Sequence, residues 1–165
     1  VVTHCPHCLH TIGKEYAKFD DGAFETLHHT ELLADLLKQG KLKAEKKQDT
    51  ELTFHDPCYL GRHHGEYNAP REILKATGVQ VKEMEKTKDE SLCCGMGGGN
   101  MWYEIDQGEE MSEKRLEHVG AEDVTKLATA CSYCLINFNS GKSERTKTEN
   151  VEIEDVASIL AKSIL

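Results

Sequence analysis

The stretch Leu127-Ala128-Thr129-Ala130-Cys131-Ser132-Tyr133-Cys134-Leu135 joins a short apolar segment directly to a CxxC motif. The apolar segment is typical of a buried strand, and the residues after it predict a helix that starts at the motif. Strands that alternate with helices form βαβ units with right-handed crossovers. The stretch therefore predicts one strand-to-helix step of an α/β fold.

The first nine residues, Val1-Val2-Thr3-His4-Cys5-Pro6-His7-Cys8-Leu9, follow the same pattern as residues 127–135. The threonine, both cysteines and the final leucine match, and the apolar positions of residues 24–37 agree with those of 151–160. Because self-similarity indicates repeated units, we expect 1–40 to be the tail of a preceding repeat and 41–165 to be a complete one. The alternative is coincidence, since a CxxC before a helix is common.

Strands and helices alternate along the rest of the chain. Hydrophobic patterns predict strands at 51–55, 79–84, 126–130 and 151–153, and helices at 30–40, 69–77, 104–119 and 156–164. We expect the first of these strands to be half-buried, and the lysine-rich residues 41–50 to be a solvated linker. The chain therefore predicts a three-layer α/β fold, a mostly parallel sheet with helices on both faces.

The composition excludes several classes of function. The 165 residues carry a formal net charge of −9, which argues against nucleic acid or an anionic membrane as a partner. The sequence has no apolar run near the roughly 18 residues that a membrane span needs, so we expect no membrane contact by this chain. A chain of this length is typical of a single domain.

Seven cysteines need a specific explanation. Six of them lie in pairs, as Cys5 and Cys8, Cys93 and Cys94, and Cys131 and Cys134. An odd count in close pairs suits a metal centre better than a secreted disulfide framework. We therefore expect a reducing, cytoplasmic location, which leaves open a parent protein at the cytoplasmic face of a membrane.

Five of these cysteines follow predicted strands. Cys58 comes after strand 51–55, Cys93 and Cys94 after strand 79–84, and Cys131 with Cys134 after strand 126–130. Because functional groups gather at the carboxyl ends of parallel strands, these thiols can meet at one sheet edge. Five thiolates exceed the four of a tetrahedral zinc site or an ordinary cubane cluster. An unusual polynuclear iron–sulfur centre is the direct interpretation.

The spacing Cys58-x34-Cys93-Cys94-Gly95-x35-Cys131-x2-Cys134, with His55-Asp56-Pro57 before it, resembles the CCG-domain family. This family occurs in the B subunit of heterodisulfide reductase and in iron–sulfur subunits that serve glycolate, lactate and glycerol-phosphate oxidation. The resemblance covers about residues 50–165 and implies a [4Fe-4S]-type cluster, noncubane in some members. Its ligands would be Cys58, Cys93, Cys94, Cys131 and Cys134. Ser132 departs from the family, since many members have proline there.

The glycines after the cysteine pair invite two interpretations. The sequence lacks the GxxxxGK[ST] pattern of a phosphate-binding loop, which argues against nucleotide binding. We expect Gly95, Gly97 and Gly98 instead to let backbone N–H groups approach cluster sulfurs, because such hydrogen bonds tune the reduction potential.

Histidines surround the first CxxC motif. His4, His7 and His10 could complete a zinc site with Cys5 and Cys8 where iron is absent. In the repeat hypothesis, the same two cysteines would instead be metal ligands whose partners precede this chain.

Four further side chains are candidates for local roles. His55 and Asp56 could orient the Cys58 loop or relay protons, although a hydrogen bond at the strand end is an equal alternative. Trp102 and Tyr103 are expected to pack their own loop.

These patterns together favour an electron-transfer module of an oxidoreductase related to heterodisulfide reductase. Its partner would be a flavin-containing or iron–sulfur protein or domain, and we expect no disulfide reduction by this chain alone. The alternatives are a structural zinc module and a thiol–disulfide exchange domain that uses a CxxC motif.

Overall fold

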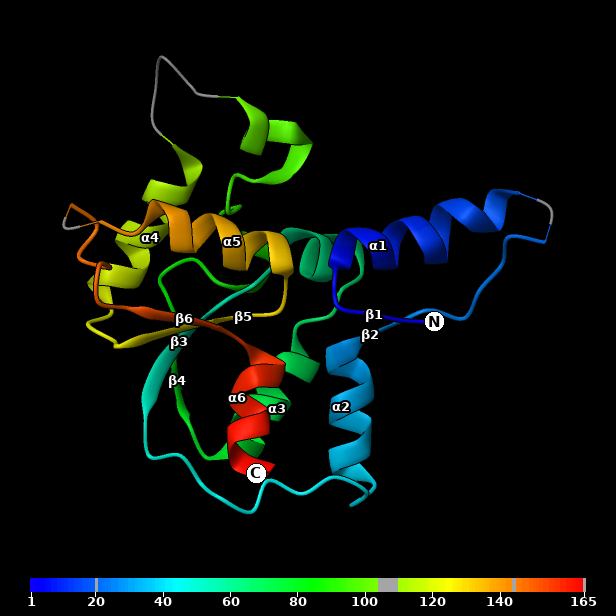
Figure 1. The fold of residues 1–165 in the computed structure, drawn as a ribbon, viewed down its shortest axis with the longest axis horizontal. Helices are drawn as coiled ribbons and strands as arrows, with labels where there is room; N and C mark the ends of the chain where they lie inside the picture. The colour runs from blue at the N-terminus through cyan, green and yellow to red at the C-terminus, as the bar shows by residue number, and fades with distance from the viewer. Residues whose placement is uncertain (20, 104–109, 144, 165) are drawn as a thin grey trace.

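Four parallel strands form the main sheet in the order β4-β3-β5-β6 (Figure 1). They are β3 (Glu51–His55), β4 (Gln80–Lys82), β5 (Lys126–Thr129) and β6 (Glu152–Asp155). His55 at the end of β3 pairs with Thr129 of β5, which pairs with Asp155 of β6. The carboxyl ends of three strands are thus level at one edge of the sheet.

The computed structural model describes residues 1–19, 21–103, 110–143 and 145–164. A second, two-stranded parallel sheet pairs β1 (Val2–Thr3) with β2 (Leu27–His28). The helices are α1 (Pro6–His10), α2 (His29–Lys38), α3 (Asn68–Thr77), α4 (Met111–Ala121), α5 (Ser132–Gly141) and α6 (Val156–Ile164). Shorter helical turns are η1 (Thr11–Glu15), η2 (Tyr16–Lys18), η3 (Tyr59–His63), η4 (Lys88–Glu90) and η5 (Gly97–Trp102).

Helices cover both faces of the main sheet (Figure 1). Leu52 and Phe54 of β3 belong to a core cluster that includes residues of α3 and α6. Leu127 of β5 and Ile153 of β6 belong to a second cluster with residues of α4 and α5. Burial of these apolar side chains holds the three layers together. The predicted three-layer α/β fold with a parallel sheet is confirmed.

The prediction that strand 51–55 is half-buried is wrong. Thr53 and His55, which alternate with the apolar residues, are 0% exposed. The reason is the position of β3, an interior strand between β4 and β5 with helices on both faces. Its polar positions therefore lie under a helix layer, and the ring of His55 packs edge-on against Phe138 of α5.

The linker predicted at 41–50 is exposed or half-buried along its length, and it is also hydrogen-bonded to the domain. The backbone N–H of Lys46 donates to the carbonyl of Ser163, and that of Gln48 to the carbonyl of Thr77. The side chain of Gln48 also donates to Ser163 Oγ at 2.7 Å. These bonds fix the segment against the ends of α3 and α6, a tertiary effect that composition does not report.

Several element boundaries also differ from expectation. The helix predicted from residue 30 begins at His29, and His28 is its N-cap. The side chain of Glu31 in the first turn accepts from the backbone N–H of His28 at 2.8 Å. Ile164, the last residue of α6, is 39% exposed. Residues 104–109 of the helix predicted at 104–119 lie outside the described residues, and α4 begins at Met111.

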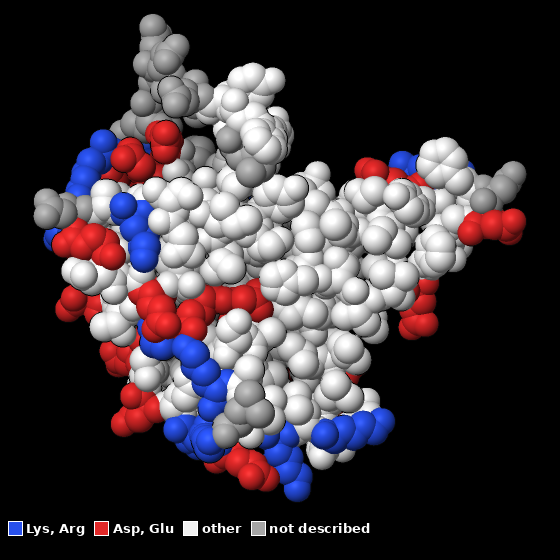
Figure 2. Space-filling view, in the orientation of Figure 1, with Lys and Arg blue, Asp and Glu red and all other residues white. Residues whose placement is uncertain are grey.

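Charged side chains are unevenly distributed on the face in Figure 2. They gather over the β6 and α6 side, whereas the surface over α1 and the adjoining end of α5 carries few of them. No helix within the described ranges has the length and apolar character needed to cross a bilayer.

Candidate metal centre

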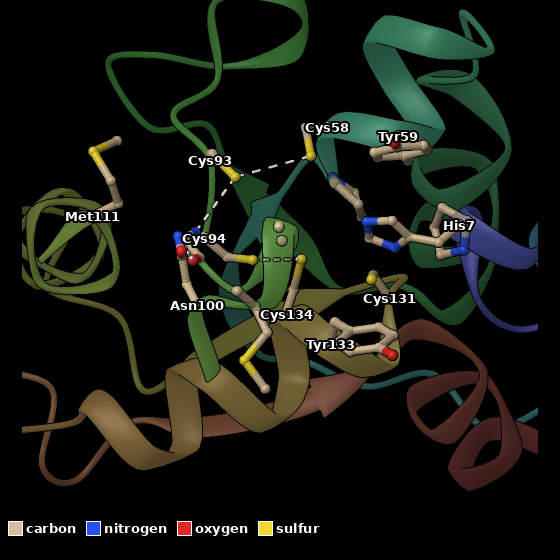
Figure 3. Close-up of a pocket in the computed structure, with 16 residues that line it drawn as sticks. His7, Cys58, Tyr59, Cys93, Cys94, Asn100, Met111, Cys131, Tyr133 and Cys134 are labelled. Carbon is tan, nitrogen blue, oxygen red and sulfur yellow. Dashed lines mark hydrogen bonds between the residues drawn. The ribbon is translucent and has the colours of Figure 1, made fainter. Parts of the chain in front are cut away.

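Five cysteines from three loops lie at the carboxyl edge of the main sheet (Figure 3). Cys58 follows β3 and immediately precedes η3. Cys93 and Cys94 lie in the loop that follows β4 and η4. Cys131 is the N-cap of α5, and Cys134 lies in the first turn of that helix. The sheet edge thus brings together the five sulfurs that the sequence placed after its strands.

These five side chains line one cavity of about 320 Å³. The remaining lining residues come from α1, η3, the glycine-rich loop, and the starts of α4 and α5: Pro6, His7, Pro57, Tyr59, Gly95, Met96, Gly97, Gly98, Asn100, Met111 and Tyr133. A mostly apolar wall around convergent sulfurs is the usual setting of a bound cofactor.

The sulfurs approach one another in pairs. The Sγ atoms of Cys58 and Cys93 are 3.9 Å apart, and those of Cys94 and Cys134 are 3.3 Å apart. Cys94, Cys131 and Cys134 are buried, while Cys58 and Cys93 are half-buried. All five are free thiols. The cavity therefore offers a set of soft sulfur donors, the kind that binds iron–sulfur clusters and zinc.

Shared protons divide the thiols into those that ionise easily and those that do not. The contact between Cys58 and Cys93 holds the pKa of Cys93 well below its usual value and raises the pKa of Cys58. In the same way, hydrogen bonds from Cys134 and His7 lower the pKa of Cys131 to about 5. Thiolates are the metal-binding form of cysteine, so two ligands are already favoured as anions.

Glycine at position 95 allows the loop to turn back on its own cysteine. Gly95 has φ +90°, and a Cβ there would lie 3.0 Å from the Cβ of Met111. Its N–H donates to Cys93 Sγ at 3.3 Å. Gly97 and Gly98 line the cavity. Among the described residues, only Gly95 of these three glycines makes the expected N–H contact with a cysteine sulfur.

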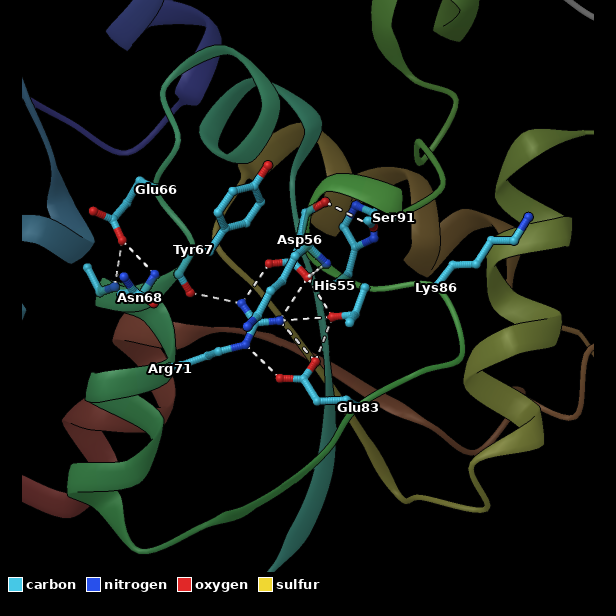
Figure 4. A network of polar contacts seen from close by, with 12 residues as sticks. His55, Asp56, Glu66, Tyr67, Asn68, Arg71, Glu83, Lys86 and Ser91 are labelled. Carbon is cyan, nitrogen blue, oxygen red and sulfur yellow. Dashed lines mark hydrogen bonds and ion pairs between the residues drawn. The ribbon is translucent and has the colours of Figure 1, made fainter.

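A polar network ties the Cys58 loop to the loop that leads to Cys93 (Figure 4). Arg71 of α3 donates to both carboxylate oxygens of Asp56, at 2.7 and 2.8 Å. It also donates to Glu83 at 2.6 Å, and the backbone N–H of Lys88 donates to Asp56 at 2.8 Å. Although burial acts the other way, the hydrogen bonds from Arg71 hold the pKa of Asp56 below its usual value. Asp56 thus connects the Cys58 loop to α3 and to the segment that leads to Cys93.

A second arginine is buried next to His55. Arg115 of α4 is 0% exposed, and its Nε donates to His55 Nδ1 at 3.2 Å. Burial lowers the pKa of His55 to about 3, so its imidazole is neutral at pH 7. Sequence reasoning missed Arg71 and Arg115 because arginine within a helix is most often a solvent-exposed residue.

Cys5 and Cys8 lie outside the five-cysteine cavity. Cys5 is the N-cap of α1, and Cys8 is exposed. His7 lies between the two regions, with Cys131 on one side and Cys5 on the other. Its hydrogen bonds to these two cysteines raise the pKa of its imidazole to about 9. In Figure 3 its ring points toward the cavity from the side of α1.

The histidines near the first CxxC have separate partners. His4 Nε2 lies 2.9 Å from Asp155 Oδ2, and the ring of His10 packs against Tyr59. Of these three histidines, His7 is the one whose ring is hydrogen-bonded to the Cys5 sulfur among the described contacts. In the part of the chain that the structure describes, the three histidines are therefore not assembled with Cys5 and Cys8 as one zinc site.

The expectation that Trp102 and Tyr103 pack their own loop is wrong. Their exposed fractions are 77% and 75%. The two glycines that precede this segment, Gly98 and Gly99, both have positive φ. The aromatic side chains project into solvent.

Comparison with known proteins agrees with this geometry. Residues 52–139, more than half of the chain, match the family described as CCG, cysteine-rich domain. The probable iron-sulfur-binding oxidoreductase FadF of Bacillus subtilis is 40% identical over 166 residues, and EtfAB:quinone oxidoreductase of Syntrophomonas wolfei is 36% identical over 171. One subunit of the dihydromethanophenazine:CoB–CoM heterodisulfide reductase of Methanosarcina mazei is 35% identical over 167 residues.

These alignments cover 100%, 99% and 99% of the chain but only 23%, 24% and 40% of the respective relatives. The chain thus corresponds to one part of each of these larger proteins. The stretch that matches the family model contains all five cysteines at the sheet edge. This chain therefore belongs to the CCG cysteine-rich domain family.

Proposed function

We propose that this chain is the iron–sulfur electron-transfer module of an oxidoreductase related to heterodisulfide reductase. The observation that carries the proposal is the convergence of five free cysteine sulfurs on one cavity of about 320 Å³. A cluster bound there would accept and donate single electrons. The proposed ligands are Cys58, Cys93, Cys94, Cys131 and Cys134, and the proposed cofactor is of the [4Fe-4S] type.

The donor set fits such a group. Five soft sulfur donors exceed what one tetrahedral zinc ion takes, and two of them already favour the thiolate form. The N–H of Gly95 and the protonated ring of His7 offer hydrogen bonds to cysteine sulfurs at the cavity. These groups offset the negative charge that several thiolates bring into a largely buried site.

The names of the relatives support this assignment and suggest the partner. One is a probable iron-sulfur-binding oxidoreductase, another an EtfAB:quinone oxidoreductase, and a third belongs to a heterodisulfide reductase. We propose a flavin-containing or iron–sulfur protein or domain as the redox partner of this chain. The weakly charged surface over α1 and α5 in Figure 2 is suited to such a contact. We propose a cytoplasmic location, where thiols stay reduced.

Residues 1–40 are proposed to be the tail of a preceding CCG repeat, with 41–165 as a complete CCG domain. Parallel pairing places Thr3 opposite His28 in the small sheet and Thr129 opposite Asp155 in the main sheet. In each case a CxxC cysteine is the N-cap of the next helix. This correspondence supports a role for Cys5 and Cys8 as ligands in a second centre.

Metal analysis of the full chain, purified without oxygen, tests the proposal. We expect a brown protein with several irons and an equal amount of acid-labile sulfide, and an electron paramagnetic resonance signal in one redox state. A colourless protein with one zinc would instead support the structural zinc module. Thiol–disulfide exchange through the second CxxC is disfavoured, because Cys131 is only 1% exposed.

A further inference from the structure

The buried ring of His55 has one nitrogen with a partner and one without. His55 is 0% exposed, and its Nε2 has no hydrogen-bond partner among the residues that the structure describes. A ring nitrogen of His55 lies within 4.8 Å of the sulfurs of Cys94 and Cys134. Buried polar atoms nearly always have a partner, so an unpartnered nitrogen on a ring that lies beside two proposed cluster ligands needs an explanation.

The contact with Arg115 determines which nitrogen carries the proton. An arginine Nε–H can only donate, so His55 Nδ1 must accept through its lone pair. A neutral imidazole that accepts at Nδ1 carries its hydrogen on Nε2. A protonated Nε2 is unable to bind a metal through a lone pair, but it can donate a hydrogen bond to sulfur.

Arg115 is itself held by neutral groups. It donates to His55 Nδ1, to the carbonyl of Lys86 at 2.8 Å and to Ser91 Oγ at 3.1 Å. Among the described residues, no carboxylate lies within ion-pair distance of this guanidinium. Asp56 and Glu83 act on this buried charge only from beyond ion-pair distance, so anionic sulfur ligands beyond His55 would be a favourable further counterpart.

We propose that His55 is a hydrogen-bond donor to the cluster site, with its Nε2–H directed at the sulfur of Cys94 or Cys134 and its tautomer fixed by Arg115. This inference rests on the proposed iron–sulfur function. His55 acts through the sulfurs and not as a sixth ligand, so it is a positioning and tuning residue. Because donors to cluster sulfurs stabilise the reduced, more negative form, His55 raises the reduction potential.

The test compares His55→Phe, His55→Gln and Thr53→Val in the full chain, each purified without oxygen with its cluster. Phenylalanine fills the ring space without a donor, whereas glutamine retains a side-chain N–H. Thr53 lies on the same buried face of β3, and its hydroxyl has no hydrogen-bond partner in the described ranges, so Thr53→Val controls for packing. The readout is the reduction potential from a redox titration followed by electron paramagnetic resonance.

We expect His55→Phe to shift the one-electron reduction equilibrium at least tenfold toward the oxidised form, about 59 mV. His55→Gln should restore part of this shift, and Thr53→Val should leave the potential unchanged. An unchanged potential in His55→Phe would overturn the inference while leaving the iron–sulfur function intact. A wild-type chain that assembles no cluster would overturn both.

Pulsed electron paramagnetic resonance of the wild-type protein provides a second readout if His55→Phe does not fold. A donor histidine predicts only weak coupling between the cluster spin and an imidazole nitrogen. Strong coupling, typical of a nitrogen bound directly to iron, would show that His55 is a ligand and overturn the inference.

Discussion

Replacement of Asp56 by asparagine tests whether the ion pair beneath Cys58 holds the site together. The side chain of Asp56 is 3% exposed and receives two hydrogen bonds from Arg71. Removing one partner of a buried ion pair costs about 3–5 kcal/mol, because the other charge is left uncompensated. Because Arg71 keeps its ion pair with Glu83, we expect the free energy of unfolding to fall by about 3 kcal/mol, the lower end of this range.

Urea unfolding of the reduced, metal-free chain at pH 7 measures this loss. With a denaturant slope of about 2 kcal/mol per molar, the midpoint of Asp56→Asn should fall by about 1.5 M. The pH dependence has a definite sign. The folded pKa of Asp56 is lowered, so its stabilisation is present above the unfolded pKa of about 3.9 and is lost as pH falls through the folded value.

The difference between the wild type and Asp56→Asn should therefore narrow below about pH 4. Lys38→Gln is the matched control, since the Lys38–Glu72 ion pair is exposed on both sides and should leave the midpoint unchanged. Equal midpoints for Asp56→Asn and wild type at pH 7 would refute the reasoning. So would a difference that persists unchanged to the lowest pH at which both proteins fold.

Two further substitutions probe packing and metal binding. In Gly120→Ala the new Cβ would lie 2.0 Å from the backbone oxygen of Thr146, so we expect the free energy of unfolding in urea to fall by about 1–3 kcal/mol. In Gly97→Ala the new Cβ would have no described atom within 4 Å, so its free energy of unfolding should be close to that of the wild type. Equal losses in the two variants would contradict this packing. After anaerobic reconstitution, a colorimetric iron assay should show that Cys58→Ser has lost most of its iron, whereas Cys8→Ser should retain the iron bound at the five-cysteine cavity. The reverse result would count against the proposed ligand set.

Local sequence patterns were sufficient for the strand-to-loop steps that carry the cysteines. The apolar segment before Cys131 forms β5, and Cys131 is the N-cap of α5, so the helix starts at the CxxC motif as predicted. The alternation at 51–55 likewise identifies β3. These signals are short-range, since they depend on side-chain periodicity and on the residue that begins a helix.

The polar surroundings of the cavity could not be predicted in the same way. Burial of His55 depends on which strands lie beside β3, and burial of Arg115 depends on how α4 packs on the sheet. The exposure of Trp102, which follows two positive-φ glycines, is likewise not visible in the spacing. Tertiary contacts determined all three, and no local pattern reports them.

Anomalous diffraction at the iron absorption edge, from crystals grown without oxygen, tests the central claim most directly. The account predicts iron peaks inside the cavity at the carboxyl edge of the main sheet, in bonding contact with the sulfurs of Cys58, Cys93, Cys94, Cys131 and Cys134. A cavity without iron, or a single zinc held by four of these sulfurs with the fifth left free, would contradict it.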